Sequence, residues 1–263
     1  MDRTGISLQL YLKENMAKLS VVIITHDEEE NIVRCLDSVK TLADEVVVVD
    51  SHSRDKTVEL SEAYGCRVFT HDFEGYGKQK QFAVDQATND WILSIDADEV
   101  VTEELKNEIK TILRDEKHAV AGYLIPFSFC YLGKILKHTK ADHLRLFNRN
   151  KGKFTTVPVH EGIVTDGVTG KLKGKIVHYS YRDISHHLQK INTYTSQAAQ
   201  KNKQDHKSYS KCWVAYKFPV SFFIYYFLRL GFLDGYPGFL WAFFAAFYGS
   251  LKIAKTIEME AKK

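Results

Sequence analysis

The sequence has few cysteines, and none of them lies in a close pair. The 263 residues include four cysteines, and no two are spaced as Cys-x-x-Cys. Zinc knuckles and disulfide-stabilised folds need clustered cysteines, so the sequence argues against both. Isolated thiols are typical of proteins in a reducing compartment, and we expect a cytoplasmic protein.

The sequence also has little excess of one sign of charge over the other. The chain has 36 Lys and Arg against 33 Asp and Glu, a formal net charge of +3. Nucleic-acid-binding domains usually concentrate basic residues on one face, so we expect no nucleic-acid partner. Residues 1–18 lack the apolar centre and small-residue cleavage site of a secretory signal. We interpret them as an N-terminal extension and expect that the protein is not exported.

What the first half does contain is an alternation of apolar strands and amphipathic helices. Residues 19–25 and 45–50 are rich in valine and isoleucine, and residues 31–43 carry apolar side chains at helical spacing. Residues 51–65 then predict a loop and a helix, 66–72 a strand, 78–88 a helix and 91–96 a fourth strand. The strands are apolar without alternation, which indicates burial on both faces. We therefore predict an α/β fold with a Rossmann-like, mostly parallel sheet flanked by helices.

Polar side chains follow three of these strands, at residues 25–28, 50–53 and 96–99. In open α/β sheets, ligands bind outside the carboxyl ends of the strands. Carboxylates that lie close together raise one another's pKa unless positive charge compensates, and a divalent cation supplies that charge. An isolated Asp-x-Asp is usually only a polar loop, but here it follows a buried strand. Because oxygen ligands suit Mg²⁺ or Mn²⁺, we predict a metal site at Asp96 and Asp98.

Five stretches of the sequence resemble a known family. SVVIITHDEEENIVRCLDSV (20–39), VVVVDSHSRDKTVELSEAYG (46–65) and GYGKQKQFAVDQATNDWILSIDADE (75–99) resemble, in order and spacing, family 2 glycosyltransferases of the GT-A fold. LRLFNRNKGKFTTVPVHEGI (144–163) and GKLKGKIVHYSYRDISHHLQKIN (170–192) are similar to a narrower group, the bacterial lipopolysaccharide core β-1,4-glucosyltransferases. The resemblance implies a GT-A catalytic domain over residues 19–182.

The resemblance also implies a role for individual positions. Asp96 and Asp98 match the Asp-x-Asp that holds a divalent cation on the diphosphate. Asp27 and Gln81 depart from the family, which usually has asparagine at both positions, so fine contacts to the nucleotide are in doubt there. The nucleotide-sugar-binding positions that the resemblance implies are Thr25, Glu28, Asp50, Ser53, Lys80, Asp96, His178 and Arg182.

The same resemblance places an acidic residue, Glu161, towards the acceptor. Sugar transfer builds negative charge on the leaving phosphate, which a metal held by Asp98 would stabilise. The acceptor hydroxyl must lose a proton as it attacks, and Glu161 is our candidate base. A single displacement of this kind inverts the anomeric configuration. Glu161 beside His160 equally suits a structural role in a turn, and Asp55 suits a helix cap better than a ligand.

Residues 183–263 change in character. Residues 183–207 predict a polar amphipathic helix, and two helices rich in aromatic residues are predicted on either side of LDGYPG (233–238). Charged residues and prolines interrupt the apolar run, so we expect no transmembrane helix. Aromatic and basic residues together suit a region lying on a membrane surface. Packing on the catalytic domain, or a dimer interface, is the alternative.

Together these features predict an inverting transferase that moves glucose from UDP-glucose onto an inner-core heptose of lipopolysaccharide. It would act as a peripheral protein on the cytoplasmic face of the inner membrane. Two alternatives stay open: a transferase that acts on polyprenyl phosphate or another cell-envelope glycan, and an inactive nucleotide-sugar-binding membrane protein. Acceptor profiling separates the favoured transferase from the alternative transferase. The sequence does not predict an oligomeric state.

Overall fold

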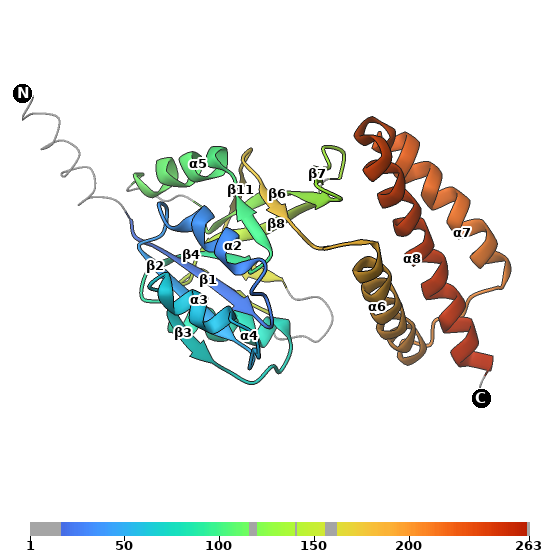
Figure 1. Ribbon diagram of the computed structural model, residues 1–263, viewed down its shortest axis with the longest axis horizontal. Coiled ribbons are helices and arrows are strands. Elements are labelled where there is room, and N and C mark those ends of the chain that lie inside the picture. Colours follow the sequence, from blue (N-terminus) through green and yellow to red (C-terminus); the bar gives the residue numbers. More distant parts are fainter. Residues whose placement is uncertain (1–16, 116–119, 140, 156–161, 262–263) are drawn as a thin grey trace, which may run out of the picture. The chain divides into compact units, whose positions relative to one another are not determined.

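The computed structural model describes residues 17–115, 120–139, 141–155 and 162–261, and these residues divide into two compact units (Figure 1). The first unit comprises residues up to Phe127 together with Ala141–His178. The second comprises Ser128–Lys140 and the chain from Tyr179 onwards. The sequence analysis assigned residues 128–140 to the catalytic domain, whereas the structure groups them with the C-terminal helices.

The first unit is built on a mixed sheet. Among the described residues, ten strands form one sheet, in the order β3-β2-β1-β4-β8-β6-β12-β5, with β11 and β7 pairing with β6. The strands β1 to β4 run parallel to one another, and β8 joins β4 antiparallel. The strand bounds are Leu19–Thr25 (β1), Glu45–Asp50 (β2), Arg67–Thr70 (β3), Trp91–Asp96 (β4), Glu99–Val101 (β5), Gly122–Tyr131 (β6), Lys134–Ile135 (β7), Ala141–Asn148 (β8), Thr169–Lys171 (β11) and Ile176–His178 (β12).

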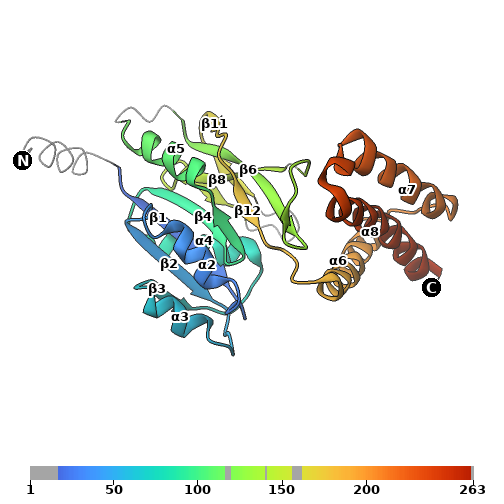
Figure 2. The same cartoon turned by 45° about the horizontal axis from the view of Figure 1, so that its top comes forward.

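Helices cover both faces of the parallel strands (Figure 2). On one face, α2 (Ile32–Val39) and α5 (Glu103–Leu113) share a buried core with β1 and β4, and on the other α4 (Tyr76–Gln86) packs on β1 and β2. Complete burial of each strand valine or isoleucine stabilises the fold by roughly 1.5–3 kcal/mol, so the unbroken apolar runs favour this arrangement. The predicted α/β class with a helix-flanked sheet is confirmed.

One further helix and a small sheet complete the first unit. Helix α3 (Thr57–Ala63) has Lys56 rather than Asp55 at its N-cap position, and Asp55, one residue earlier, accepts hydrogen bonds from the backbone nitrogen and hydroxyl of Thr57. The sequence analysis did not predict α5, which begins at the N-cap Thr102. Strands β9 (Gly152–Phe154) and β10 (Ile163–Thr165) form a separate antiparallel pair.

The second unit is helical. Helix α6 spans Ile184–Gln204, and α7 (Cys212–Phe223) continues into a π-helix, η1 (Ile224–Leu228). A 3-10 helix, η2 (Gly231–Asp234), leads into α8 (Gly235–Ala261). Two aromatic-rich helical segments are present as predicted, but residues 233–238 do not separate them: these residues lie within η2 and the first turn of α8, and the break falls at Arg229 and Leu230. Pro219, expected to interrupt the apolar run, lies inside α7.

An aromatic core holds the second unit together. Tyr131 and Leu136, from the end of β6 and the loop after it, are buried with Ile191 of α6 and Phe244 of α8. The carboxylate of Asp234, which is 2% exposed, accepts hydrogen bonds from the backbone nitrogens of Lys137 and His138 at 3.0 Å each. Residues 128–140 are thereby tied to the start of α8.

Membrane-spanning character was tested on the described helices. None of them alone has the length and apolar composition of a membrane span, whereas Cys212–Leu228 and Gly231–Ala261, bent by 69° at their junction, meet those criteria as a pair.

Candidate active site

The carboxyl ends of three parallel strands meet at one edge of the sheet. In the strand register, Thr25 of β1 lies beside Asp50 of β2, and Ile24 lies beside Asp96 of β4. The three polar strand ends that the sequence analysis singled out are therefore neighbours in space. The hydroxyl of Thr25 is buried and has no hydrogen-bond partner among the described residues.

Asp50 organises the loop that follows β2. It is 1% exposed, and its carboxylate accepts hydrogen bonds from the backbone nitrogen of Ser53 at 2.8 Å and from the Ser53 hydroxyl at 2.5 Å. The Ser53 hydroxyl in turn accepts from the backbone nitrogen of Asp27 at 2.8 Å. Asp50 and Ser53 thus join the loops after β1 and β2 into one rigid edge.

The backbone conformation at Asp27 explains why aspartate can replace asparagine at this position. Its φ is 53°, in the left-handed region, which asparagine and aspartate enter more readily than other non-glycine residues. Its carboxylate accepts from the backbone nitrogen of Arg54 at 2.7 Å. The departure at this position therefore preserves the loop conformation.

Glu28 lies just before α2. Its backbone nitrogen donates to the Thr57 hydroxyl at 2.8 Å, and its carboxylate accepts from the side chain of Asn31 at 2.7 Å. Its backbone oxygen accepts from the nitrogens of Asn31 and Ile32, where the helix begins. Glu28 thus lies in the loop after β1, which Ser53 joins to the loop after β2, and its nucleotide-binding role stays a prediction.

The carboxylate of Asp96 lies between two cations. The ammonium of Lys80, a 5% exposed residue on α4, is 2.9 Å from Asp96 Oδ1, and Arg145 Nη2, from β8, is 3.2 Å from Asp96 Oδ2. Burial opposes ionisation of Asp96, but Lys80 and Arg145 outweigh it and hold the pKa well below its usual range. Asp96 is therefore ionised, and Lys80 faces the acid cluster, whereas its predicted contact with the nucleotide stays a prediction.

Glu99 braces the turn that carries these acids. It is fully buried, accepts from the backbone nitrogen of Asp96 at 2.9 Å and receives a hydrogen bond from Arg145 at 2.8 Å. Burial, together with the charge of Asp96, raises the pKa of Glu99 to about 7, although Arg145 opposes the shift. The arginine also lies 5.1 Å above the ring of Phe127, which fixes its plane.

Asp98 has a different partner from Asp96. Strand β12 pairs antiparallel with β5, which sets His178 opposite Glu99 and brings His178 Nε2 to 3.1 Å from Asp98 Oδ2. Burial would lower the pKa of His178, but the hydrogen bond and charge of Asp98 raise it above the usual value. Asp98 and His178 form a second acid–base pair beside the Asp96 cluster.

Gln81, the other departure from the family, has a structural role. Its side chain accepts from the backbone nitrogen of Phe154 at 2.8 Å and donates to Asp85 at 2.8 Å. It therefore holds β9 against α4. Its neighbour Gln79 is fully buried and donates to the hydroxyl of Ser51 at 2.9 Å, close to the Asp50 loop.

Two predicted site residues fall outside the described part of the first unit. Glu161 lies outside the described residues, so its role as base stays a prediction. Arg182 belongs to the second unit, where its backbone nitrogen donates to His186 Nδ1 at 3.3 Å. The sequence analysis missed Arg145 and the bracing role of Glu99. A basic residue inside the apolar strand LRLFN was the available signal for Arg145.

The donor atoms at this edge of the sheet determine whether it can bind a metal ion. The described residues contain no group of three or more His, Cys, Asp or Glu side chains arranged to hold a metal ion. Asp98 and His178 offer two adjacent ligands of suitable chemistry, and sites of this class complete their coordination with substrate oxygens and water. They fit a cation held jointly with a substrate. The predicted metal role of Asp96 stays a prediction, and its carboxylate is engaged by Lys80 and Arg145.

Comparison with known proteins identifies the family. Residues 20–170 match the family described as "Glycosyl transferase family 2". The chain is 33% identical over 260 residues to an uncharacterized glycosyltransferase of Rickettsia typhi, which covers 94% of this chain and 89% of the relative. This chain belongs to glycosyl transferase family 2. It is thus a glycosyltransferase of the GT-A fold, and the strand ends described above lie within the matched region of this family 2 enzyme.

Two further similarities concern named proteins. The chain is 30% identical over 263 residues to "Lipopolysaccharide core biosynthesis glycosyltransferase LpsC" of Rhizobium meliloti, covering 93% of this chain and 94% of that relative. A crystal structure of S. aureus TarS 1-349 in complex with UDP-GlcNAc is 30% identical, with a TM-score of 0.36. That match covers 43% of this chain and 35% of the TarS chain.

Proposed function

We propose that this family 2 glycosyltransferase transfers glucose from UDP-glucose to an inner-core heptose of lipopolysaccharide, in a single metal-assisted displacement that inverts the anomeric configuration. The observation that most supports this proposal is the edge of the sheet after β4. There, the acids Asp96, Asp98 and Glu99 lie beside the basic residues Lys80, Arg145 and His178. Acids and cations held together in this way suit a ligand that carries both a diphosphate and its counter-ion.

The chain's own residues bind and orient the donor. Thr25, Asp50 and Ser53 line the edge where the nucleoside would bind. Lys80 and Arg145 hold positive charge next to the diphosphate position and favour the charge that builds on the leaving phosphate. Their positions are fixed before a donor arrives, so little reorganisation is needed during the reaction.

Asp98 and His178 would hold a divalent cation on the diphosphate. When bound, such a cation stabilises the leaving diphosphate as a Lewis acid. The acceptor hydroxyl needs a base, and we assign Glu161 to remove its proton on the opposite face of the sugar. Arg182 is assigned to the diphosphate.

The acceptor assignment follows the likeness to LpsC, whose name specifies lipopolysaccharide core biosynthesis and which covers nearly the whole chain. Because such an acceptor is anchored in a membrane, the enzyme would act on the cytoplasmic face of the inner membrane. The second unit suits this location: residues 207–257 contain six Lys and Arg and a single acid, Asp234, which is buried. Large exposed apolar side chains from the same region include Trp213, Tyr216, Phe223, Phe227, Leu228, Phe232, Leu233 and Tyr236.

A donor and acceptor screen tests the proposal. The purified enzyme is incubated with UDP-, GDP- and ADP-sugars and with lipopolysaccharide truncated at the inner core, and the mass of the lipid is followed. We expect a hexose mass gain with UDP-glucose that disappears on chelation and returns with Mg²⁺ or Mn²⁺. Transfer to polyprenyl phosphate in place of truncated core would replace the proposed acceptor. Donor binding without any transfer would contradict the proposed reaction.

A further inference from the structure

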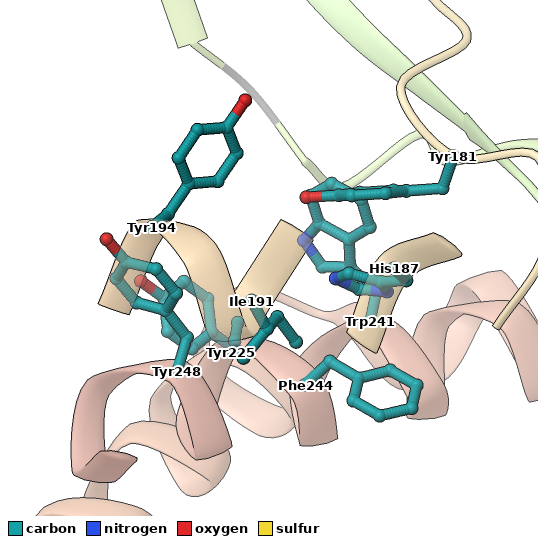
Figure 3. A pocket seen from close by; sticks show the side chains of 9 residues that line it. Tyr181, His187, Ile191, Tyr194, Tyr225, Trp241, Phe244 and Tyr248 are labelled. Carbon is teal, nitrogen blue, oxygen red and sulfur yellow. The ribbon is translucent and has the colours of Figure 1, made fainter. Parts of the chain in front are cut away.

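The second unit contains a pocket that the proposed transfer reaction does not use. It has a volume of about 210 Å³, and Tyr181, His187, Ile191, Tyr194, Tyr225, Trp241, Phe244, Ala245 and Tyr248 line it. Figure 3 shows Tyr194, Tyr225 and Tyr248 gathered at one end and Tyr181, His187 and Trp241 at the other. Its walls come from α6, from the π-helix η1 and from α8, and π-helical turns frequently occur at functional sites.

The pocket lining is mostly aromatic and carries no formal charge, and the hydroxyls of four tyrosines are among its polar groups. His187 is stacked on Tyr181, with ring centroids 3.8 Å apart, and its Nδ1 is already hydrogen-bonded to the Tyr131 hydroxyl at 3.0 Å. Burial lowers the pKa of His187 to about 4 and raises that of Tyr181 to about 12, so both rings are neutral at physiological pH. Most of the surface that these rings present to the pocket is carbon, and contact with a hydrocarbon removes that surface from water. The lining therefore favours a hydrocarbon.

Positive charge lies at both ends of the pocket. The ammonium of Lys190 is 5.7 Å from the centre of the Tyr181 ring, and the guanidinium of Arg229 is 4.9 Å from the centre of the Tyr225 ring. A mostly aromatic cavity bordered by cations is complementary to a molecule with a hydrocarbon chain and an anionic head. The volume exceeds the ~150 Å³ of an engineered cavity that admits benzene, so a chain end would fit, although a whole lipid would not.

We propose that this pocket binds part of the acyl chain of an anionic phospholipid, while Arg229, at one end of the pocket, contacts its headgroup. The inference rests on the membrane association proposed above and is independent of the transfer chemistry. The exposed aromatic side chains of η1 and α8 would lie among neighbouring lipids, so one lipid could enter the pocket from the membrane. Binding of this kind would make attachment selective for lipid charge.

Trp241 provides a direct reporter of pocket occupancy. In a Trp213→Tyr protein the remaining tryptophans are Trp241 and Trp91, and Trp91 is 1% exposed in the core of the first unit. The full-length protein is mixed with vesicles of phosphatidylcholine that contain phosphatidylglycerol with brominated acyl chains. Flotation of the vesicles is measured in the same samples. We expect the bromine atoms to quench Trp241, and to quench it more than the same bromines carried on phosphatidylcholine.

A substitution that fills the pocket distinguishes lipid binding inside the pocket from general attachment of the protein to the membrane. Ala245 lines the pocket, and Ala245→Phe should abolish the quenching while flotation persists. Ala215→Phe, which adds the same ring at an exposed position of α7, is the matched control and should keep the quenching. Circular dichroism confirms folding of each variant. Should Ala245→Phe not fold, Arg229→Gln gives an independent test, with about a fivefold loss in affinity for phosphatidylglycerol expected.

The outcomes distinguish the two proposals. Flotation without quenching of Trp241 overturns the pocket inference and leaves membrane association standing. Equal quenching in the parent protein and in folded Ala245→Phe, or equal quenching by the two lipid types, also overturns it. Absence of both flotation and quenching overturns both, and none of these readouts depends on glycosyl transfer.

Discussion

Arg145 donates a hydrogen bond across 2.8 Å to Glu99, a carboxylate with no exposure to solvent. The same guanidinium nitrogen lies 3.2 Å from Asp96, whose backbone nitrogen donates to Glu99. The acidic turn after β4 is thereby fixed from within the fold before any ligand binds. Removal of one partner leaves a buried charge without compensation, which typically costs 3–5 kcal/mol.

Replacement of Arg145 should therefore damage both activity and stability. We expect Arg145→Lys to lower kcat/KM by at least about tenfold, because an ammonium cannot span Asp96 and Glu99 as a planar fork does. Arg145→Met should also destabilise the enzyme by about 3 kcal/mol in urea unfolding. Arg149→Lys, which changes a neighbouring arginine that donates to the backbone of Ala87, is the control. Unchanged kinetics in Arg145→Lys would refute the positioning role.

The assignment of a cation to Asp98 and His178 predicts a shared phenotype. Asp98→Asn and His178→Ala should each reduce transfer by roughly 10²–10³-fold, because the leaving diphosphate loses electrostatic stabilisation. Both should weaken Mn²⁺ binding in the presence of UDP, measured by electron paramagnetic resonance. Asp96→Asn helps to separate the two acids: if Mn²⁺ binding survives there and fails in Asp98→Asn, the metal does not need Asp96. Full activity of Asp98→Asn in the presence of chelator would exclude the metal role.

If Glu161 is the catalytic base, its replacement should slow the transfer step without weakening donor binding. Glu161→Gln should lower kcat by about 10²–10⁴-fold and leave the affinity for UDP unchanged. Isothermal titration with UDP and single-turnover transfer measure the two effects separately. A purely structural Glu161 would instead give a variant with near-normal kcat, or one with a lowered melting temperature.

The neutral His187 predicts acid sensitivity of the second unit. Burial depresses the pKa of His187 in the folded state to about 4, below its value of 6.5 in the unfolded chain. The unfolded state therefore takes up a proton first as the pH falls, and stability is lost between pH 6.5 and 4, by up to about 3 kcal/mol. His187→Phe keeps a ring against Tyr181 but removes the titration. Unfolding free energies of parent and variant that run parallel over this range would disprove the idea.

The parallel half of the sheet was predictable because its strands are buried on both faces. Valine and isoleucine without alternation identified β1 and β2, and the acids after β4 marked the edge where ligands bind. The pairing of β12 with β5 was not predictable, because these three-residue strands carry no periodic signal. That pairing brings His178 to Asp98, so the partner of each acid emerged only from the structure.

Arg145 illustrates the same limit. Its strand, β8, joins β4 antiparallel after a long excursion of the chain, and no local pattern reveals which strand end it will face. Asp27 illustrates the reverse. A departure from the family that raised doubt about nucleotide contacts is explained by backbone conformation, which sequence comparison does not display.

The assignment of Ser128–Lys140 to the helical unit affects how this enzyme can be dissected. A truncated protein that ends near residue 182 would retain Tyr131 and Leu136 but lose Ile191 and Phe244, the partners that bury them. It would also lose Asp234, which caps the backbone of Lys137 and His138. Such a fragment would expose an apolar hairpin and tend to aggregate, so the catalytic half is not an autonomous module that can be excised at a single point in the chain.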